Sequence, residues 1–577
     1  MDLPAVPTPH DCARQIVEAF ARYNAEFRAI TRRAPQRFDA RDWKASQRDA
    51  VERIELYGRY VNQTIAALRL ALGARAIDRS LWQELRSEFA AQITALSDPE
   101  FTKTFFSSIS RRLFGTVGVA PDIEFVATDL DPLADIHSAI GTNSYVNHGS
   151  LALLIEDLLG DVRFLSAWRD LDTSIAHVTG EVRSYLRSRD ERRAVDRVEV
   201  IRAVFYQMSR AYIVGRILGR GYLVPLVIAL KNTDGGVLVD AVMLAEADVS
   251  IVFSFTRSYF HADLERVAEA VVFLRSLMPR KPVSELFTVL GRARQGKTER
   301  YRELMRNLEH ADDRFVHAAG ERGLVMVCFT LPSFDVVFKV IRDRFAYPKT
   351  VLREEVMEKY RLVFIHDRAG RLVDAQEFRR LRFPRARFAP ELLEELRRET
   401  AGTVHEDGDD LVFDHLYIER RMTPLNLYVR NSSAAEAERA VLDYGQCIRD
   451  LAYTNIFPGD LLLKNFGVTR HGRVIFYDYD ELCQVTDCNF REVPPATHEE
   501  DEMLGEAWFY VAENDVFPET FLNFLGFSEE QRAALLRVHG EILTAGFWRA
   551  VQQRLREGEV MEVLPYHPHR VRVAGSL

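Results

Sequence analysis

The stretch FPGDLLLKNFGV, residues 457–468, is followed after a five-residue gap by VIFYDYDE, residues 474–481. The first stretch carries Asp460 and, five positions later, Asn465. The run VIFY is rich in β-branched and aromatic residues, which is typical of a strand, and it ends directly before Asp478. This order of loop, strand and loop is expected to present an amide and a carboxylate side by side.

The spacing of these residues is typical of phosphoryl transfer. That reaction asks a protein mainly to position a hydroxyl and to neutralise phosphates with metal ions and a lysine. In protein kinases a catalytic-loop Asp precedes an Asn by five positions, and a second, metal-binding Asp opens a later loop. Asp460, Asn465 and Asp478 follow this order, with Asp478 13 positions after Asn465.

A glycine-containing loop and a strand lysine precede these residues. AAGERGLVMVCFTLPSFDVVFKVI, residues 318–341, holds Gly320, Gly323 and then Lys339 in a strand-like run that resembles the V-A-I-K of kinases. Taken singly, Lys339 also fits an edge-strand lysine, and the glycines fit an ordinary turn, because the third glycine of G-x-G-x-x-G is missing. The joint order of all these parts predicts a kinase-like fold.

Several positions depart from the kinase pattern. Pro458 and Gly459 stand where kinases have His and Arg, and Asp-Tyr-Asp stands for Asp-Phe-Gly. Lys464 adjoins the Asn instead of following the Asp by two positions. Small-molecule phosphotransferases with a kinase-like fold tolerate such changes, so the motif alone leaves the substrate open. A degenerate kinase that acts as a scaffold is the non-enzymatic alternative.

The bulk properties are those of a globular protein with more than one domain. The chain has 577 residues, too many for one core, with 47% hydrophobic and 28% charged residues. A net charge of −9 argues against nucleic acid as a partner, and no apolar run approaches the ~20 residues of a membrane helix. Five scattered cysteines indicate reduced thiols in a cytoplasm, and Cys483 and Cys488 are interpreted as ordinary thiols.

The apolar periodicity changes along the chain. The first two hundred residues are predicted to be helical, and strand-like runs at 221–230 and 237–244 surround a hairpin signal. We expect a strand or buried segment at 250–260. A second unit is predicted from about residue 311, with strands at 324–330, 336–341 and 409–422 and a helix at 434–455.

The chain resembles bacterial isocitrate dehydrogenase kinase/phosphatase over essentially its whole length. The likeness lies in FPGDLLLKNFGVTRHGRVIFYDYDE (457–481), HLYIERRMTPLN (415–426), TLPSFDVVFKVIRDRF (330–345), SIVFSFTRSYF (250–260) and HDRAGRLVDAQEF (366–378). It implies an α+β fold, in which a mainly helical regulatory domain (1–310) precedes a protein-kinase-like bilobal catalytic domain (311–577). The implied activity is phosphorylation and dephosphorylation of a serine of isocitrate dehydrogenase, which controls the branch between the citric acid cycle and the glyoxylate bypass.

The resemblance also assigns roles to residues. Asp460 would orient the serine hydroxyl, Lys464 would balance charge on the transferred phosphate, and Asp374 would serve the phosphatase reaction. Asn465 and Asp478 would hold Mg²⁺ or Mn²⁺, with Asp480 close by. The residues expected to bind ATP or ADP are Ala318, Ala319, Gly320, Glu321, Arg322, Gly323, Leu324 and Lys339.

Partners and two local features remain open at this point. The resemblance implies isocitrate dehydrogenase as the protein substrate, AMP and other metabolites as effectors, a cytoplasmic location and room for a homodimer, with no nucleic acid or membrane. Glu354, Glu355 and Glu358 are equal candidates for a helix partner of Lys339. The arginine-rich segment 379–388 fits either a docking surface for an acidic substrate or a solvated basic loop.

Overall fold

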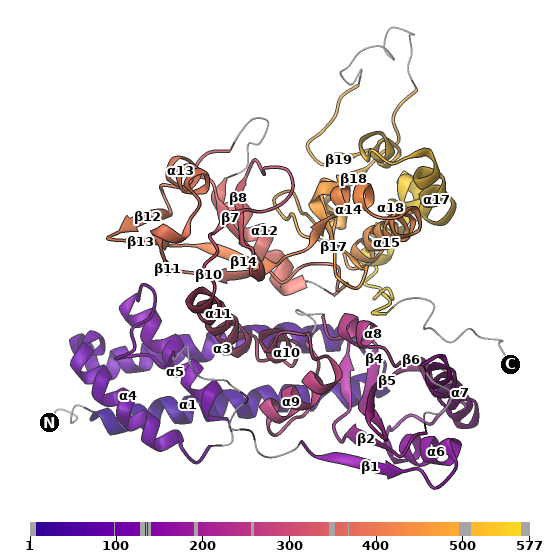
Figure 1. The fold of residues 1–577 in the computed structure, drawn as a ribbon, viewed down its shortest axis with the longest axis horizontal. Helices are drawn as coiled ribbons and strands as arrows, with labels where there is room; N and C mark the ends of the chain where they lie inside the picture. Colours follow the sequence, from indigo (N-terminus) through magenta and orange to yellow (C-terminus); the bar gives the residue numbers. More distant parts are fainter. Residues whose placement is uncertain are drawn as a thin grey trace. The chain divides into compact units, whose positions relative to one another are not determined.

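The computed structural model describes residues 7–96, 98–126, 133, 136, 140–189, 194–254, 259–345, 352–366, 368–495 and 509–566. The chain forms two compact units (Figure 1). Unit 1 comprises Met1–Asp312 together with the chain from Pro565, and unit 2 comprises Asp313–Leu564. Among the described residues, no helix combines the length and apolarity that a membrane crossing requires.

The first half of unit 1 is a helical bundle. Its helices are α1 (Pro9–Thr31), α2 (Ala34–Asp39), α3 (Trp43–Leu72), α4 (Arg79–Ile93) and α5 (Pro99–Phe114). Helix α1 begins at a capping box on Thr8, and its apolar residues recur every three or four positions along one buried face. The Tyr23 ring of that face packs against Phe101 and Phe105 of α5, so aromatic contacts hold α1 to α5.

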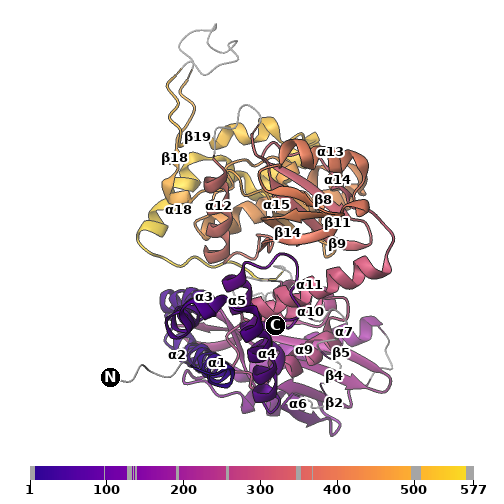
Figure 2. The ribbon, with the colours of Figure 1, turned by 90° about the vertical axis from the view of Figure 1, so that its left-hand side faces the viewer.

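The second half of unit 1 contains an antiparallel sheet in the order β1-β2-β4-β5-β6, with β3 paired to β4 (Figures 1 and 2). Helices α6 (Leu151–Asp161) and α7 (Leu171–Arg189) share a hydrophobic core with it. The strands are β1 (Thr142–Val146), β2 (Arg197–Ile201), β3 (Phe205–Gln207), β4 (Arg210–Gly219), β5 (Tyr222–Thr233) and β6 (Gly236–Met243).

The predicted β5–β6 hairpin is confirmed, but two other expectations for unit 1 are wrong in part. Strands β1 and β2 interrupt the first two hundred residues, which had been expected to be helical. The stretch 250–260 is largely buried where it is described, as one of its two interpretations predicted, but its first residues form the end of helix α8 (Glu246–Val252) and not a strand. Residues 255–258 lie outside the described residues.

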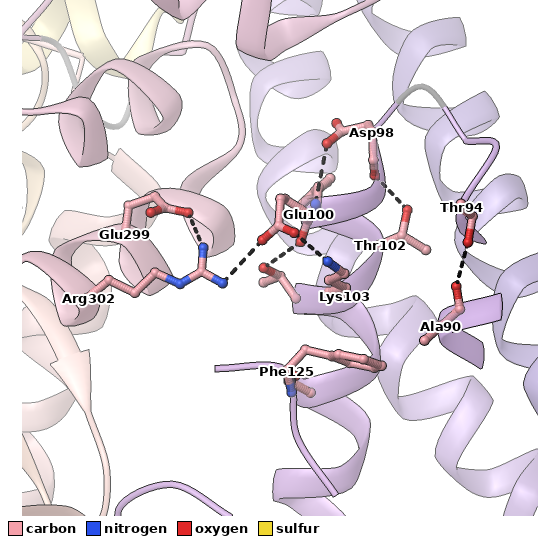
Figure 3. Close-up of polar contacts among 12 residues, drawn as sticks. Ala90, Thr94, Asp98, Glu100, Thr102, Lys103, Phe125, Glu299 and Arg302 are labelled. Atoms are coloured by element: carbon pink, nitrogen blue, oxygen red, sulfur yellow. Dashed lines mark hydrogen bonds and ion pairs between the residues drawn. The ribbon is translucent and has the colours of Figure 1, made fainter. Parts of the chain in front are cut away.

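Three further helices complete unit 1: α9 (Val267–Leu277), α10 (Val283–Val289) and α11 (Ala293–His310). A partly buried ion network joins α11 to α5 (Figure 3). Arg302 donates to Glu299 at 2.8 Å and to Glu100 at 3.2 Å, and Lys103 donates to Glu100 at 2.6 Å. Because Glu299 is only 1% exposed, burial raises its pKa to about 7 in spite of Arg302.

The chain returns to unit 1 at Pro565. Tyr566 is 1% exposed, and its hydroxyl donates a hydrogen bond to Asp240 of β6. Arg210 of β4 lies 2.9 Å from the same carboxylate and donates to the Tyr566 hydroxyl at 2.8 Å. Tyr566 thus completes a buried polar cluster on the sheet of unit 1.

Unit 2 begins with a five-stranded sheet in the order β10-β14-β9-β8-β7. Helix α12 (Arg353–His366) contributes to the core of unit 2, where Tyr360 stacks on Tyr417 with ring centroids 4.2 Å apart. The strands are β7 (Val316–His317), β8 (Met326–Leu331), β9 (Phe334–Ile341), β10 (Gln376–Phe378) and β14 (Leu416–Arg420).

The expectation of one strand over 409–422 is wrong. Its first part is β13 (Asp410–Phe413), which pairs with β11 (Leu381–Pro384) and β12 (Val404–Asp407) in a separate sheet beside helix α13 (Pro390–Glu399). Its second part is β14. The chain leaves the three-stranded sheet after Asp414, whose backbone N–H bonds to the Thr403 carbonyl at 2.9 Å, and enters the five-stranded sheet at Leu416.

Four of the five arginines of segment 379–388 pair with carboxylates of unit 2. Arg382 bonds to Asp407 and Arg385 to Glu406, both on β12. Arg379 and Arg387 lie close to Glu377 and Asp313. Since these pairs neutralise charge within the unit, they favour a structural role for the segment over a docking surface.

The rest of unit 2 is mainly helical. Helix α15 (Ala434–Tyr453) confirms the predicted helix and shares its core with α17 (Glu529–His539) and α18 (Ala545–Arg556). Helix α14 (Leu425–Asn431) precedes it. The short strands are β15 (Thr423–Pro424), β16 (Phe466–Val468), β17 (Val474–Phe476), β18 (Asn489–Phe490) and β19 (Asp515–Val516).

Candidate active site

A cavity of about 190 Å³ lies in unit 2. One wall consists of the glycine-containing loop and the strands that carry Lys339 and Glu419. The opposite wall consists of the segments after α15, with Tyr477 among them. Of the residues predicted to be catalytic, nucleotide-binding or metal-binding, all but Asp374 line this cavity: Ala318, Ala319, Gly320, Glu321, Arg322, Gly323, Leu324, Lys339, Asp460, Lys464, Asn465, Asp478 and Asp480.

Lys339 of β9 lies in the cavity wall with its ammonium group held by two acceptors. Its Nζ lies 2.8 Å from Glu419 Oε1 and donates to the Tyr477 carbonyl at 2.7 Å. Both charged side chains are nearly inaccessible, at 5% and 4% exposure. Burial alone would lower the pKa of Lys339, but Glu419, followed by Cys328 and Asp478, outweighs it and raises the pKa. The lysine therefore stays charged in the folded protein.

The partner of Lys339 is not a helix glutamate, which corrects the expectation of Glu354, Glu355 or Glu358 on α12. In the antiparallel pairing of β9 with β14, Tyr417 lies opposite Lys339 and Glu419 lies opposite Val337. Glu419 is thus the diagonal neighbour of Lys339 on the same sheet face, within reach of a long side chain. The pair is fixed by strand register.

The glycine-containing loop is tied down at both ends. Arg342 Nε donates to the Gly323 carbonyl at 3.2 Å, and Arg342 also bonds to Glu395 at 2.7 Å. Glu395 accepts a second hydrogen bond, from His317, at 2.6 Å. Across the cavity, Lys464 forms an ion pair with Glu321 of the loop at 3.1 Å, with both side chains substantially exposed. That exposed pair can open when an anionic ligand competes for Lys464.

The loop that carries Asp460 has a defined local geometry. Asp460 accepts a hydrogen bond from the Leu462 backbone N–H at 2.8 Å, and the Asn465 side chain reaches the Asp460 carbonyl at 3.4 Å. Gly459 has φ +77°, and a Cβ there would lie 2.4 Å from the Glu481 carbonyl oxygen. Glycine stands at 459, where kinases have arginine, because this loop passes directly against the segment after Asp480.

The strand pairing of β16 with β17 places Asn465 beside Asp478. Phe466 pairs with Phe476, and the Tyr477 N–H bonds to the Asn465 carbonyl at 3.1 Å, so the amide lies directly before β16 and the carboxylate lies just after the paired end of β17. Asp480 is 8% exposed, and its backbone carbonyl accepts a hydrogen bond from Lys359 of α12 at 2.8 Å. Two carboxylates and an amide fit Mg²⁺, which commonly takes few protein oxygens and completes its shell with phosphates and water.

Asp374 lies outside the residues that line the cavity. It is 7% exposed, and the Gln376 amide donates to its carboxylate at 2.8 Å. The preceding residue, Val373, donates to the Phe476 carbonyl at 3.3 Å and accepts a hydrogen bond from the Tyr479 hydroxyl at 2.8 Å. Asp374 is therefore connected to the loop of Asp478 and Asp480 through its backbone neighbour.

Sequence reasoning missed two residues that organise this site. Glu419 has no spacing relation to Lys339 along the chain, and only the strand register pairs them. Arg371 is 2% exposed and bonds to Asp443 and Asp450 of α15 and to the Val474 carbonyl of β17. Arg371 thus joins the segment before Asp374 to helix α15 and strand β17. The available sequence signal was an arginine that stands among apolar residues, which indicates a buried cation with a carboxylate partner.

Comparison with known proteins agrees with this geometry. Residues 13–312 match the regulatory domain, and residues 313–568 the kinase domain, of isocitrate dehydrogenase kinase/phosphatase (AceK). The isocitrate dehydrogenase kinase/phosphatase of Anaeromyxobacter sp. (strain Fw109-5) is 48% identical over 563 residues, which cover 98% of this chain and 98% of that protein. That of Xanthomonas euvesicatoria pv. vesicatoria (strain 85-10) is 48% identical over 560 residues, covering 97% and 96%.

Proposed function

Since the chain belongs to the isocitrate dehydrogenase kinase/phosphatase family, we propose that the cavity of unit 2 binds ATP or ADP with Mg²⁺ and serves both reactions of the enzyme. The chain is a bifunctional enzyme, a kinase and a phosphatase, that regulates isocitrate dehydrogenase at the branch of the citric acid cycle and the glyoxylate bypass. The kinase-domain match implies phosphoryl transfer from a nucleotide. A serine of isocitrate dehydrogenase is the proposed acceptor.

One observation carries this proposal: Lys339, Asp460, Asn465 and Asp478 line a single cavity. Lys339, kept charged by Glu419, contacts the α- and β-phosphates. Asp460 accepts the serine proton and orients the hydroxyl toward the γ-phosphorus, and Lys464 leaves Glu321 to balance charge on the transferred group. Asn465 and Asp478, with Asp480 beside them, would hold the magnesium ion, which would supply positive charge to neutralise the phosphates.

For the phosphatase reaction we assign Asp374 the task of positioning the attacking water. Support comes from its family resemblance and from its backbone connection to Tyr479, between the two metal-binding carboxylates. A carboxylate that accepts a proton from water would make the water a better nucleophile toward phosphoserine. Asp374 reaches the substrate only if its loop shifts toward the cavity, because it does not line the cavity in this structure.

Unit 1 is proposed to be the regulatory domain and unit 2 the catalytic domain. AMP and other metabolites are the proposed effectors, acting through unit 1. The enzyme is proposed to work in the cytoplasm, and a homodimer is its proposed assembly. The match of residues 13–312 to the family's regulatory domain supports this division.

A labelling experiment tests the function. The full chain is incubated with isocitrate dehydrogenase, Mg²⁺ and ATP labelled at the γ-phosphate, and unlabelled ADP is then added in excess. We expect label on a serine of isocitrate dehydrogenase, no label when EDTA is present, and loss of label after the chase. Asp460→Asn should abolish labelling, whereas Asp409→Asn, a change at an exposed hairpin position, should leave it intact. Failure of the wild-type chain to label isocitrate dehydrogenase would refute the proposal.

A further inference from the structure

Two cysteines lie in the segment that follows Asp480. Cys483 Sγ and Cys488 Sγ are 3.5 Å apart, on either side of a single 3-10 turn at Val485–Asp487. Cys488 is 8% exposed and Cys483 is half-buried. A short approach of the two sulfurs would therefore suffice to form a bond of about 2.05 Å.

The surroundings hold this pair against the catalytic loop. The Gln552 amide of α18 donates to the Val485 and Cys488 carbonyls, both at 2.7 Å, which fixes the turn between the cysteines. Cys483 exchanges two backbone hydrogen bonds with Phe457, at 2.9 and 3.0 Å. Phe457 lies three residues before Asp460, so a displacement of Cys483 is transmitted to the loop of the site.

The other thiols of the chain differ from Cys483. Cys12 and Cys447 are completely buried, and burial raises the pKa of each. Burial likewise raises the pKa of Cys328 to about 12. For Cys483, a hydrogen bond from Cys488 lowers the pKa despite partial burial, with Lys359 contributing. The accessible member of the pair is thus the better nucleophile.

Metal binding is a weaker interpretation of the pair. Within the part of the chain that the structure describes, no group of three or more His, Cys, Asp or Glu side chains is arranged to hold a metal ion. A structural zinc site needs four ligands, of which these cysteines supply two. Redox chemistry, in contrast, needs only the two sulfurs.

We propose that Cys483 and Cys488 are a reversible oxidation site, at which a hydroperoxide produces an intramolecular disulfide that slows phosphoryl transfer. The Cys483 thiolate attacks the peroxide oxygen, breaks the O–O bond and becomes a sulfenic acid, while the peroxide leaves as an alcohol or as water. The Cys488 thiol then attacks the sulfenic sulfur, forms the S–S bond and releases water. The two thiols lose two electrons and two protons in total, and the peroxide is reduced. A dithiol restores both thiols by exchange.

The effect on activity follows from the contacts of the turn. Bond formation draws Cys483 toward Cys488, and the Phe457 pairing and the tight approach of Gly459 to Glu481 pass this shift to Asp460. Displacements near 1 Å can cost about a hundredfold in rate, so we expect at least about a tenfold loss of transfer. This consequence rests on the proposed function, whereas disulfide formation does not.

Peptide mass spectrometry tests the site itself. The full chain is treated with hydrogen peroxide, denatured, alkylated and digested with trypsin. Both cysteines fall in one peptide, VIFYDYDELCQVTDCNFR, residues 474–491. We expect this peptide to lose two hydrogen atoms and resist alkylation, and the remaining three cysteines to be alkylated. Dithiothreitol before alkylation should reverse the change. Alkylation of both Cys483 and Cys488 after peroxide, or a linkage to another cysteine, would overturn the proposal.

Variants separate the steps. Cys488→Ser should stop at a sulfenic acid on Cys483 that dimedone labels, and Cys483→Ser should leave Cys488 unoxidised. Cys328→Ser, the matched control, should form the disulfide like the wild type. In the labelling assay, peroxide should slow the wild type at least about tenfold, reversibly, and leave the double variant Cys483→Ser/Cys488→Ser unaffected. A disulfide without loss of activity would overturn the regulatory part, and failure of the reduced wild type to transfer phosphate would instead count against the proposed function.

Discussion

Replacing Glu419 with glutamine tests whether a strand glutamate holds Lys339 in place. The pair is 2.8 Å apart, and its side chains are 5% and 4% exposed. Removing one partner of a buried ion pair leaves an uncompensated charge and costs about 3–5 kcal/mol. In a unit the size of Asp313–Leu564, each kcal/mol lowers the melting temperature by about 2–4 °C, so we expect a drop of about 6–20 °C.

The same change should weaken nucleotide binding. Without Glu419, Lys339 loses the largest of the charges that raise its pKa, so burial lowers that pKa relative to the wild type and the ammonium group loses its fixed partner. Losing a charge-assisted hydrogen bond costs about 1.5–3 kcal/mol, which corresponds to a rise of about 10–100-fold in the KM for ATP. The loss should appear mainly in KM, because Asp460 and its loop keep their contacts.

A double-mutant cycle measures the pair directly. Scanning calorimetry of the full-length chain compares the wild type, Glu419→Gln, Lys339→Met and the double variant, with the transition of unit 2 assigned by its shift on nucleotide addition. We expect a coupling energy of about 3 kcal/mol. Glu438→Gln, which breaks an exposed pair with Arg537 at 3.4 Å, is the matched control and should change stability by less than about 1 kcal/mol. A coupling below about 0.5 kcal/mol, together with a raised KM in Glu358→Gln, would refute the strand pairing.

Three further changes probe the site and unit 1. Gly459→Ala should cost more stability than Gly472→Ala, because the two residues have φ of +77° and +76° but only a Cβ at 459 would meet a carbonyl oxygen, at 2.4 Å. The melting temperature and the transfer rate should therefore fall more for Gly459→Ala, and equal effects of the two changes would contradict the close contact. Asp374→Ala should keep kinase turnover and lose phosphatase turnover, measured in parallel on one preparation; equal loss of both would argue against a separate role. Glu299 has a folded pKa of about 7 against an ordinary 4.5, so the folded state binds the extra proton and its stability falls as pH rises from 4.5 to 7, by about 3 kcal/mol. Urea denaturation of Glu299→Gln across that range should show a correspondingly flatter pH profile, and an unchanged slope would mean that Glu299 titrates normally.

The part of the site that the sequence predicts well is the part built by short-range geometry. Asp460, Asn465 and Asp478 lie within 19 consecutive residues, and one short strand pair brings them together. Their spacing therefore determines their proximity. Lys339 is fixed by its place on a strand next to a glycine-containing loop, which is also a local pattern.

Features that depend on long-range pairing were not predictable in this way. Glu419 meets Lys339 only because β14 pairs with β9 in one particular register, and neighbouring carboxylates on α12 offered equally good spacing. The split of 409–422 depends on long-range pairing as well, because β13 pairs with β11 and β12 whereas β14 pairs with β9 and β10. The sequence left segment 379–388 open between a docking surface and a solvated basic loop, because the β12 partners of Arg382 and Arg385 lie 25 and 21 positions away and share no motif with them.

The return of the chain to unit 1 has a consequence for biosynthesis. A ribosome produces the sheet with Arg210 and Asp240 early, but the phenol that joins their buried cluster arrives only after all of unit 2 has been translated. Until residue 566 emerges, the nascent regulatory half holds this charged pair without its third member. A chain cut short within unit 2 would leave Arg210 and Asp240 without the phenol, so we expect such a fragment to be less stable and more sensitive to proteases than the full chain.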